Sequence, residues 1–183
     1  MKNYKKNLEL LTENHVYSKE MEHDACGVGL IASTEGKKSR AVVEYGIEAL
    51  KAVWHRGAVD ADGKTGDGAG IHVEIPKDFF IEKIQVTGHD YDNSEICIGM
   101  IFLPRNDYSA QESCKTIVES ELTKNNFSIY GWRQVPVNPK VLGEKALLTM
   151  PEIIQVLFKS NNQNLLDKNL ERKIYETRKR IEN

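Results

Sequence analysis

A glycine-rich segment at residues 57–70 (GAVDADGKTGDGAG) constrains the fold most strongly, because a regular helix or strand does not run through such a sequence. It contains five glycines and no large apolar side chain. This composition is typical of a loop whose backbone takes left-handed dihedral angles or approaches another group closely. The segment therefore separates the regular elements that precede residue 57 from those that follow residue 70.

Two familiar ligand-binding loops are similar to this segment but fail on spacing. A phosphate-binding P-loop would need glycine at position 58, five residues before Gly63, and that position is alanine. The predicted helix before the segment also stands where a P-loop has a strand. A calcium loop starting at Asp60 would need glycine at its sixth position, which is Thr65. The remaining interpretation is a tight turn in which the Asp67 carboxylate accepts backbone N–H bonds.

Short apolar or alternating runs predict the strands. They occur at 27–32, 71–75, 96–103, 127–135 and 152–158. Pro76 and Pro104 end two of these runs.

Capping residues and periodicity predict the helices. The first runs from a Ser39 cap to about His55, the second from a Ser109–Glu112 capping box to about Lys124, and the third from Asp167 onward. Two apolar stripes are expected to be buried: Val43, Ile47, Leu50 and Trp54 on the first helix, and Leu170, Ile174 and Ile181 on the last. Together the elements predict an α+β layered fold with a largely antiparallel sheet.

The charge balance gives no reason to expect nucleic acid or a membrane surface as a partner. The 183 residues include 25 basic and 27 acidic side chains, for a net charge of −2. No stretch approaches the ~20 apolar residues of a membrane helix, and residues 1–25 lack the apolar core of a secretory signal. We therefore expect a cytoplasmic protein.

Three widely spaced cysteines predict neither a disulfide framework nor a structural zinc site. Cys26, Cys97 and Cys114 form no C-x-x-C pair and no cluster with histidine, so no metal site is expected. Cys97 lies within an apolar run and Cys114 within a predicted helix, which favours inert core positions for both.

Cys26 stands where a polar leader gives way to an apolar run, and it allows two interpretations. Most free cysteines are small buried apolar residues. Alternatively, cleavage after Ala25 would give Cys26 a free α-amino group with a pKa of about 7.7–8.0, so one residue would supply both nucleophile and general base. The second interpretation makes residues 1–25 a removable propeptide.

The basic residues His55 and Arg56 also allow two interpretations. Basic side chains at a helix end interact favourably with the helix dipole. In the functional alternative, Arg56 supports the nucleophile by holding loop carbonyls or a carboxylate.

Three blocks of sequence resemble the amidotransferase part of the glutamate synthase family. They are CGVGLIA at 26–32, HRGAVDADGKTGDGAGI at 55–71, and GWRQVPVN at 131–138 with LGEKAL at 142–147. The similarity extends from about Glu22 to the last residue. It implies a class II glutamine amidotransferase of the N-terminal-nucleophile hydrolase fold, a four-layer αββα sandwich with largely antiparallel sheets, incomplete in this chain.

The resemblance also implies roles for particular residues. Cys26 becomes the catalytic nucleophile after propeptide removal, and residues 26–183 form the N-terminal part of the amidotransferase domain. Supporting positions in the loop beside the nucleophile are Arg56, Gly57, Asp67 and Gly68. The substrate is glutamine, and the ammonia released aminates 2-oxoglutarate elsewhere in the synthase.

The implied partners are the remaining synthase domains and a small NADPH-oxidising subunit. FMN and an iron–sulfur cluster are implied for the full-length enzyme, with no cofactor in this segment. The family's later His-Gln-Arg-Phe-Ser-Thr-Asn and His-Asn-Gly-Glu segments do not occur here. One alternative to the synthase therefore stays open, a catalytically incomplete fragment acting as a binding or assembly module. A further alternative is a related N-terminal-cysteine amide hydrolase, but the match through the 55–71 block argues against it.

Overall fold

The computed structural model describes residues 6, 9–10, 12–13, 27–54, 57–162 and 167–183. The chain divides into two compact units, of which the first comprises Met1–Val59 and Gly66–Ile71. The second comprises Asp60–Thr65 and His72–Asn183. Within the described residues, no helix is long and apolar enough to cross a membrane.

The main element of the first unit is helix α2, Arg40–Ala52. Its predicted cap is confirmed, because the Ser39 side chain accepts the Ala41 N–H at 3.2 Å. The predicted burial of its apolar stripe is wrong: every residue of α2 is described and none is buried, and Trp54 beyond it is 77% exposed. A stripe is fully buried only where another element covers it, and Val43, Ile47 and Leu50 are only half-buried here.

The strands predicted at 27–32 and 71–75 are also wrong for the described structure, where both segments are irregular. A strand needs a neighbour for its N–H and C=O groups, and the described ladders do not include these segments. Val28 and Leu30 are therefore 92% and 88% exposed, although the sequence suggested a buried strand.

The second unit is built on a three-stranded antiparallel sheet, which confirms the predicted sheet type. Its strands are β1 (Cys97–Leu103), β2 (Phe127–Gln134) and β3 (Glu152–Ser160), in the order β1-β3-β2. All three were predicted within two residues of their observed ends. The central residue Val156 pairs with Gly99 of β1 and with Trp132 of β2.

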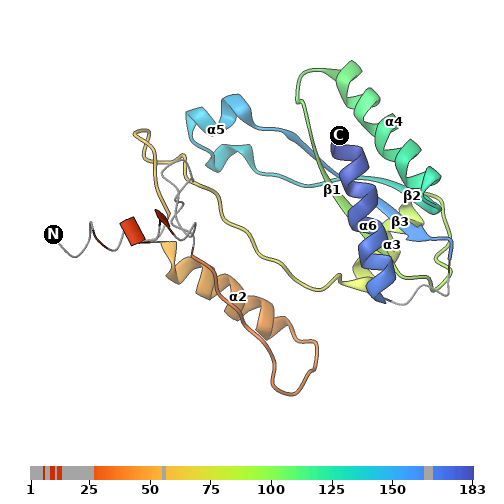
Figure 1. Ribbon diagram of the computed structural model, residues 1–183, viewed down its shortest axis with the longest axis horizontal. Coiled ribbons are helices and arrows are strands. Elements are labelled where there is room, and N and C mark those ends of the chain that lie inside the picture. Colours follow the sequence, from red (N-terminus) through yellow and green to blue (C-terminus); the bar gives the residue numbers. More distant parts are fainter. Residues whose placement is uncertain (1–5, 7–8, 11, 14–26, 55–56, 163–166) are drawn as a thin grey trace. The chain divides into compact units, whose positions relative to one another are not determined.

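Four α-helices and a short 3-10 helix accompany this sheet (Figure 1). They are α3 (Lys77–Val86), α4 (Tyr108–Lys124), η2 (Pro139–Val141), α5 (Glu144–Thr149) and α6 (Asp167–Glu182). The end of α4 agrees with the prediction, but its cap does not, because Asp107, rather than Ser109, accepts the Ala110 N–H. Sequence reasoning missed α3 and α5.

Two apolar clusters hold helices on opposite faces of the sheet, since successive strand residues point to opposite sides. On one face, Val118 and Leu122 of α4 and Leu170 of α6 pack with Val156 and other strand residues. On the other face, α3 packs against Tyr130 and Leu157 through Phe80 and Ile84. Ile174 and Ile181 pack against the first cluster, so the predicted apolar side of the last helix is confirmed.

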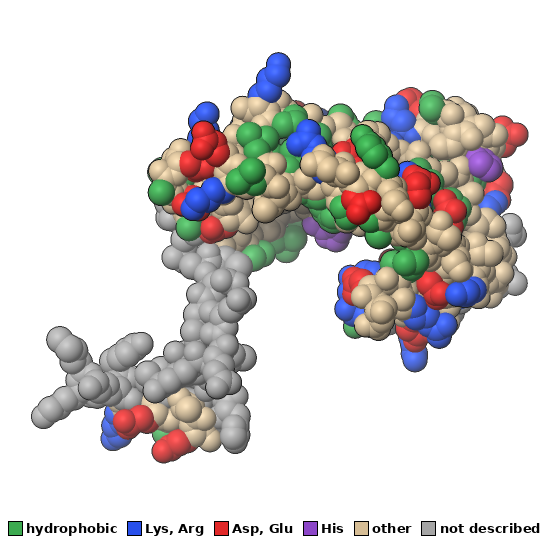
Figure 2. All heavy atoms as spheres, turned by 90° about the horizontal axis from the view of Figure 1, so that it is seen from above, with side chains coloured by type: hydrophobic (Ala, Val, Ile, Leu, Met, Phe, Trp, Pro, Cys, Tyr) green, Lys and Arg blue, Asp and Glu red, His purple; other side chains and the backbone are tan. Residues whose placement is uncertain are grey.

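Basic and acidic side chains lie next to one another on the surface (Figure 2). Helix α6 shows the pattern clearly, with ion pairs between Arg172 and Glu176 and between Arg178 and Glu182. Such pairs at i,i+4 are typical of a solvated helix face.

Truncation of Leu157 tests the second cluster. Its side chain is 0% exposed, so Leu157→Ala should lower the free energy of unfolding by about 2–5 kcal/mol through lost burial and a cavity. Leu148, which is 86% exposed, provides the control, and Leu148→Ala should change the value by less than about 0.5 kcal/mol. Chemical denaturation of both variants measures the difference, and equal effects would contradict this assignment of the core.

The Cys97 thiol should be unreactive in the folded protein. Burial raises its pKa to about 12, and the neighbouring Glu95 and Glu171 carboxylates act in the same direction. Because the thiolate is the reactive form, a thiol reagent at pH 8 should modify Cys97 only at the rate at which the unit opens. Mass spectrometry of peptides after timed labelling checks this, and rapid native labelling of Cys97 would refute it.

Candidate functional site

Two of the predicted site residues, Cys26 and Arg56, lie outside the described residues. The other three, Gly57, Asp67 and Gly68, are described and belong to the first unit. They lie at the two ends of the glycine-rich loop 57–70. Gly57 lies five residues beyond Ala52, the last residue of α2, and its N–H donates to the Trp54 carbonyl at 3.0 Å.

The base of the loop is closed by Asp67. Its Oδ2 accepts the Ala58 N–H at 2.7 Å, and Val59 forms an antiparallel bridge with Gly66 beside it. This confirms the prediction that Asp67 accepts a backbone N–H bond. The next residue, Gly68, has φ +92, a left-handed conformation that favours glycine.

The tip of the loop, Asp60–Thr65, is a compact turn that belongs to the second unit. The Asp60 N–H donates to the Thr65 carbonyl at 2.8 Å, and the Gly63 N–H donates to the Asp60 carbonyl at 2.9 Å. Gly63 has φ +67, so glycine is required there by the backbone conformation. Both glycine positions confirm the prediction of left-handed dihedral angles in this segment.

Asp62 organises the inside of the turn. Its Oδ1 accepts the backbone N–H groups of Lys64 at 2.9 Å and Thr65 at 2.7 Å, and its Oδ2 accepts the Thr65 hydroxyl at 2.5 Å. The Thr65 hydroxyl, the Thr65 and Lys64 N–H groups and the Lys145 backbone N–H hold the Asp62 pKa well below its ordinary value of 3.8. The turn is therefore built around an ionised carboxylate.

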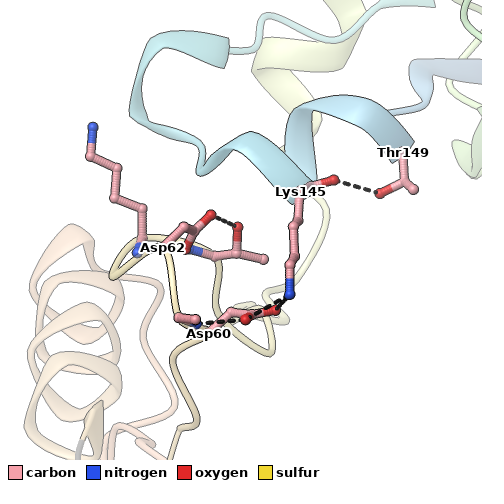
Figure 3. A network of polar contacts seen from close by, with 7 residues as sticks. Asp60, Asp62, Lys145 and Thr149 are labelled. Atoms are coloured by element: carbon pink, nitrogen blue, oxygen red, sulfur yellow. Dashed lines mark hydrogen bonds and ion pairs between the residues drawn. The ribbon is translucent and has the colours of Figure 1, made fainter.

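The start of α5 meets this turn at two points (Figure 3). The Lys145 Nζ donates to both oxygens of Asp60, at 2.8 and 2.7 Å. A Cβ atom on Gly143 would lie 2.6 Å from the Thr65 nitrogen and closer still to Asp62 Oδ2, so this approach requires glycine. Residues 60–65 of the 55–71 block thus lie against the 142–147 block of the family resemblance.

Sequence reasoning assigned no role to Asp60, Asp62, Gly143 or Lys145. The sequence did offer one clue, because the LGEKAL block at 142–147 and the glycine-rich block both belong to the family resemblance. It did not show that these two segments are in contact. The ion pair has side chains 63% and 35% exposed, so it contributes only about 0.2–1 kcal/mol to stability. The pair joins the loop tip to the first turn of α5.

Neither the loop nor the rest of the described chain contains a group of three or more His, Cys, Asp or Glu side chains that could hold a metal ion. The site therefore consists of a loop of defined backbone geometry that is held by carboxylates. Such a loop can support a nucleophile that comes from another segment of the chain.

The chain belongs to the class II glutamine amidotransferases, whose family model matches residues 26–183. Among curated relatives, it is 53% identical over 179 residues to the "Glutamate synthase [NADPH] large chain" of Azospirillum brasilense, covering 98% of this chain and 12% of the relative. It is 40% identical over 174 residues to the "Ferredoxin-dependent glutamate synthase" of Pyropia yezoensis, covering 94% and 11%. The chain spans about a tenth of the length of these relatives.

The Asp62 carboxyl should stay ionised through the pH range in which an ordinary aspartate becomes protonated. Because its pKa is lowered in the fold, its stabilising effect is complete above the unfolded value and is lost only as pH falls through the lower folded value. An NMR titration of the side-chain carboxyl carbon checks this. Thr65→Val removes the hydroxyl donor and should move the midpoint upward, whereas a wild-type midpoint at 3.8 would exclude the bonding described.

Proposed function

We propose that this chain is the glutamine-hydrolysing N-terminal part of a glutamate synthase large polypeptide, and that it supplies ammonia for amination of 2-oxoglutarate. The observation that carries the proposal is the family match beginning at Cys26, together with 53% identity to a synthase large chain across nearly the whole length. The pairing of the loop tip with α5 supports it further, since both motif blocks enter one local structure.

In the proposed reaction, Cys26 is the N-terminal residue of the mature protein. Its neutral α-amine accepts the thiol proton while the sulfur attacks the side-chain amide carbon of glutamine. The carbon–nitrogen bond breaks as the α-ammonium returns the proton, which releases ammonia and leaves a thioester. Water then hydrolyses the thioester to glutamate and regenerates the thiol. Residues 1–25 must be removed first, because an amide nitrogen is not basic.

The loop residues have supporting roles in this proposal. Asp67 closes the loop base through the Ala58 N–H, and Gly68 supplies the left-handed backbone that follows it. Gly57 precedes this closure and donates its N–H to the Trp54 carbonyl. Arg56 stands next to Gly57 in sequence and is assigned to holding loop carbonyls or a carboxylate. None of these groups reacts with glutamine covalently.

The redox cofactors are assigned to the remainder of the synthase. An iron–sulfur cluster needs several cysteine thiolates, and this chain has only three cysteines. Cys97 is held as a buried neutral thiol, so the residues present do not fit a cluster. The partners proposed are the remaining synthase domains and a small NADPH-oxidising subunit, the latter favoured by the name of the 53% identical relative.

Substitution of Cys26 tests the proposal in a complete synthase made by joining this chain to the remaining length of the A. brasilense large chain. Cys26→Ala should lower glutamine-dependent glutamate synthesis by at least ~10³-fold, because no second group supplies the nucleophile. Synthesis from added ammonia should persist. Cys114→Ala is the matched control and should retain both activities.

Two results would overturn the proposal. One is full glutamine-dependent activity in the Cys26→Ala synthase. The other is an intact mass that still includes residues 1–25 in active enzyme, since Cys26 would then lack a free amine. A joined synthase that uses ammonia but never glutamine would favour an assembly role for this chain.

A further inference from the structure

We infer that Lys145 is a positioning residue for glutamine hydrolysis: by holding Asp60, it keeps the loop tip, Asp60–Thr65, in the conformation that the reaction needs. This inference rests on the function proposed above. Lys145 is not proposed to touch the substrate or the reacting atoms. Its effect passes through the loop backbone.

The contact between Lys145 and Asp60 is directional. The Nζ lies 2.8 and 2.7 Å from the two carboxylate oxygens, so it fixes the orientation of the carboxylate as well as its distance. Lys145 extends from the first turn of α5, and Figure 3 shows its side chain reaching from that helix to the turn. The cation is thus attached to a regular element, while the anion belongs to a loop.

A second contact at the same helix start prevents the loop tip from pivoting about the ion pair. Gly143 leaves the space in which Asp62 and Thr65 lie, because a Cβ atom built on it would collide with Asp62 Oδ2 and with the Thr65 nitrogen. The ion pair and this close packing involve different residues of the turn, so together they restrict its orientation as well as its position. Asp60 and Asp62 therefore have different effects. Asp62 accepts the hydrogen bonds that stabilise the turn, and Asp60 forms the ion pair that joins the turn to α5.

The loop needs a contact outside itself because its glycine-rich sequence has a high conformational entropy when it is free. Five glycines in fourteen residues leave the unanchored backbone many conformations, and fixing each glycine costs more entropy than fixing another residue. The internal bonds, Asp60 to Thr65 and Ala58 to Asp67, close the loop but do not place it. Loss of the Lys145 contact should therefore leave a closed turn at Asp60–Thr65 that is less firmly held against α5.

Kinetics of the joined synthase test this prediction. Lys145→Met keeps the side-chain length and removes the charge, so kcat for glutamine hydrolysis should fall about 10- to 100-fold through misplacement of the loop. KM for glutamine should stay within about twofold, because binding groups are unchanged. Lys145→Arg should recover most of kcat, since a guanidinium can also bond both carboxylate oxygens.

Two further variants separate positioning from a general loss of structure. Lys140→Met, in η2, removes a lysine charge from the same part of the chain without touching Asp60 and should retain full kcat. Asp60→Asn should resemble Lys145→Met, and the double variant should be no worse than either single one. Wild-type kcat in Lys145→Met, failure of Lys145→Arg to recover activity, or additive losses in the double variant would each overturn the inference.

Amide hydrogen exchange in the full chain distinguishes failure of this inference from failure of the proposed function. The Lys64 and Thr65 amides, which donate to Asp62, should exchange faster in Lys145→Met than in wild type or Lys140→Met. Full activity of the Cys26→Ala synthase would reject the proposed function, and the exchange rates would still decide whether Lys145 holds the loop. Equal exchange in all three chains would reject the role of Lys145, whatever the synthase does.

Discussion

The attachment of two aspartates to the start of a short helix is the constraint on which the candidate site depends. Asp62 converts a flexible glycine sequence into a turn by accepting several N–H bonds, and its low pKa reports how strongly those donors favour the charged form. Asp60 then gives the finished turn one external contact, with Lys145. The ion pair of Asp60 depends on the hydrogen bonds of Asp62, because a single external contact can hold the turn in place only if the turn already has a defined conformation.

The sheet of the second unit is what makes that anchor effective. Its two clusters bury residues on both faces, so the unit has a core without any contribution from the segments that carry the proposed chemistry. Helix α5 leads directly into β3, the central strand, through Met150 and Pro151. In contrast, α2 and residues 27–32 of the first unit leave apolar side chains exposed. The structural support and the chemistry are thus in different parts of the sequence.

Sequence predicted those elements whose signals are local, and it failed where a distant partner decides the outcome. The runs at 96–103, 127–135 and 152–158 became strands because each found a neighbour in the same sheet. The runs at 27–32 and 71–75 have similar apolar character but no such neighbour in the described chain. For the site, the hydrogen bond of Asp67 and the left-handed backbone at Gly68 followed from loop chemistry. The Lys145–Asp60 pair did not, because 85 residues separate its members.

The glycines of this site are required for two different physical reasons. Gly63 and Gly68 have left-handed φ angles, yet nothing lies within 4 Å of a Cβ atom built on either residue. Gly143 has an ordinary φ of −72, but such an atom would collide with Thr65. A D-alanine at Gly63 or Gly68 would therefore fit the existing backbone and stiffen the unfolded loop, since mirror-image residues favour positive φ. The requirement at Gly143 is different, because the space beside its Cα is already filled by Asp62 and Thr65. Its φ is also negative, so a D-alanine would gain no conformational advantage there.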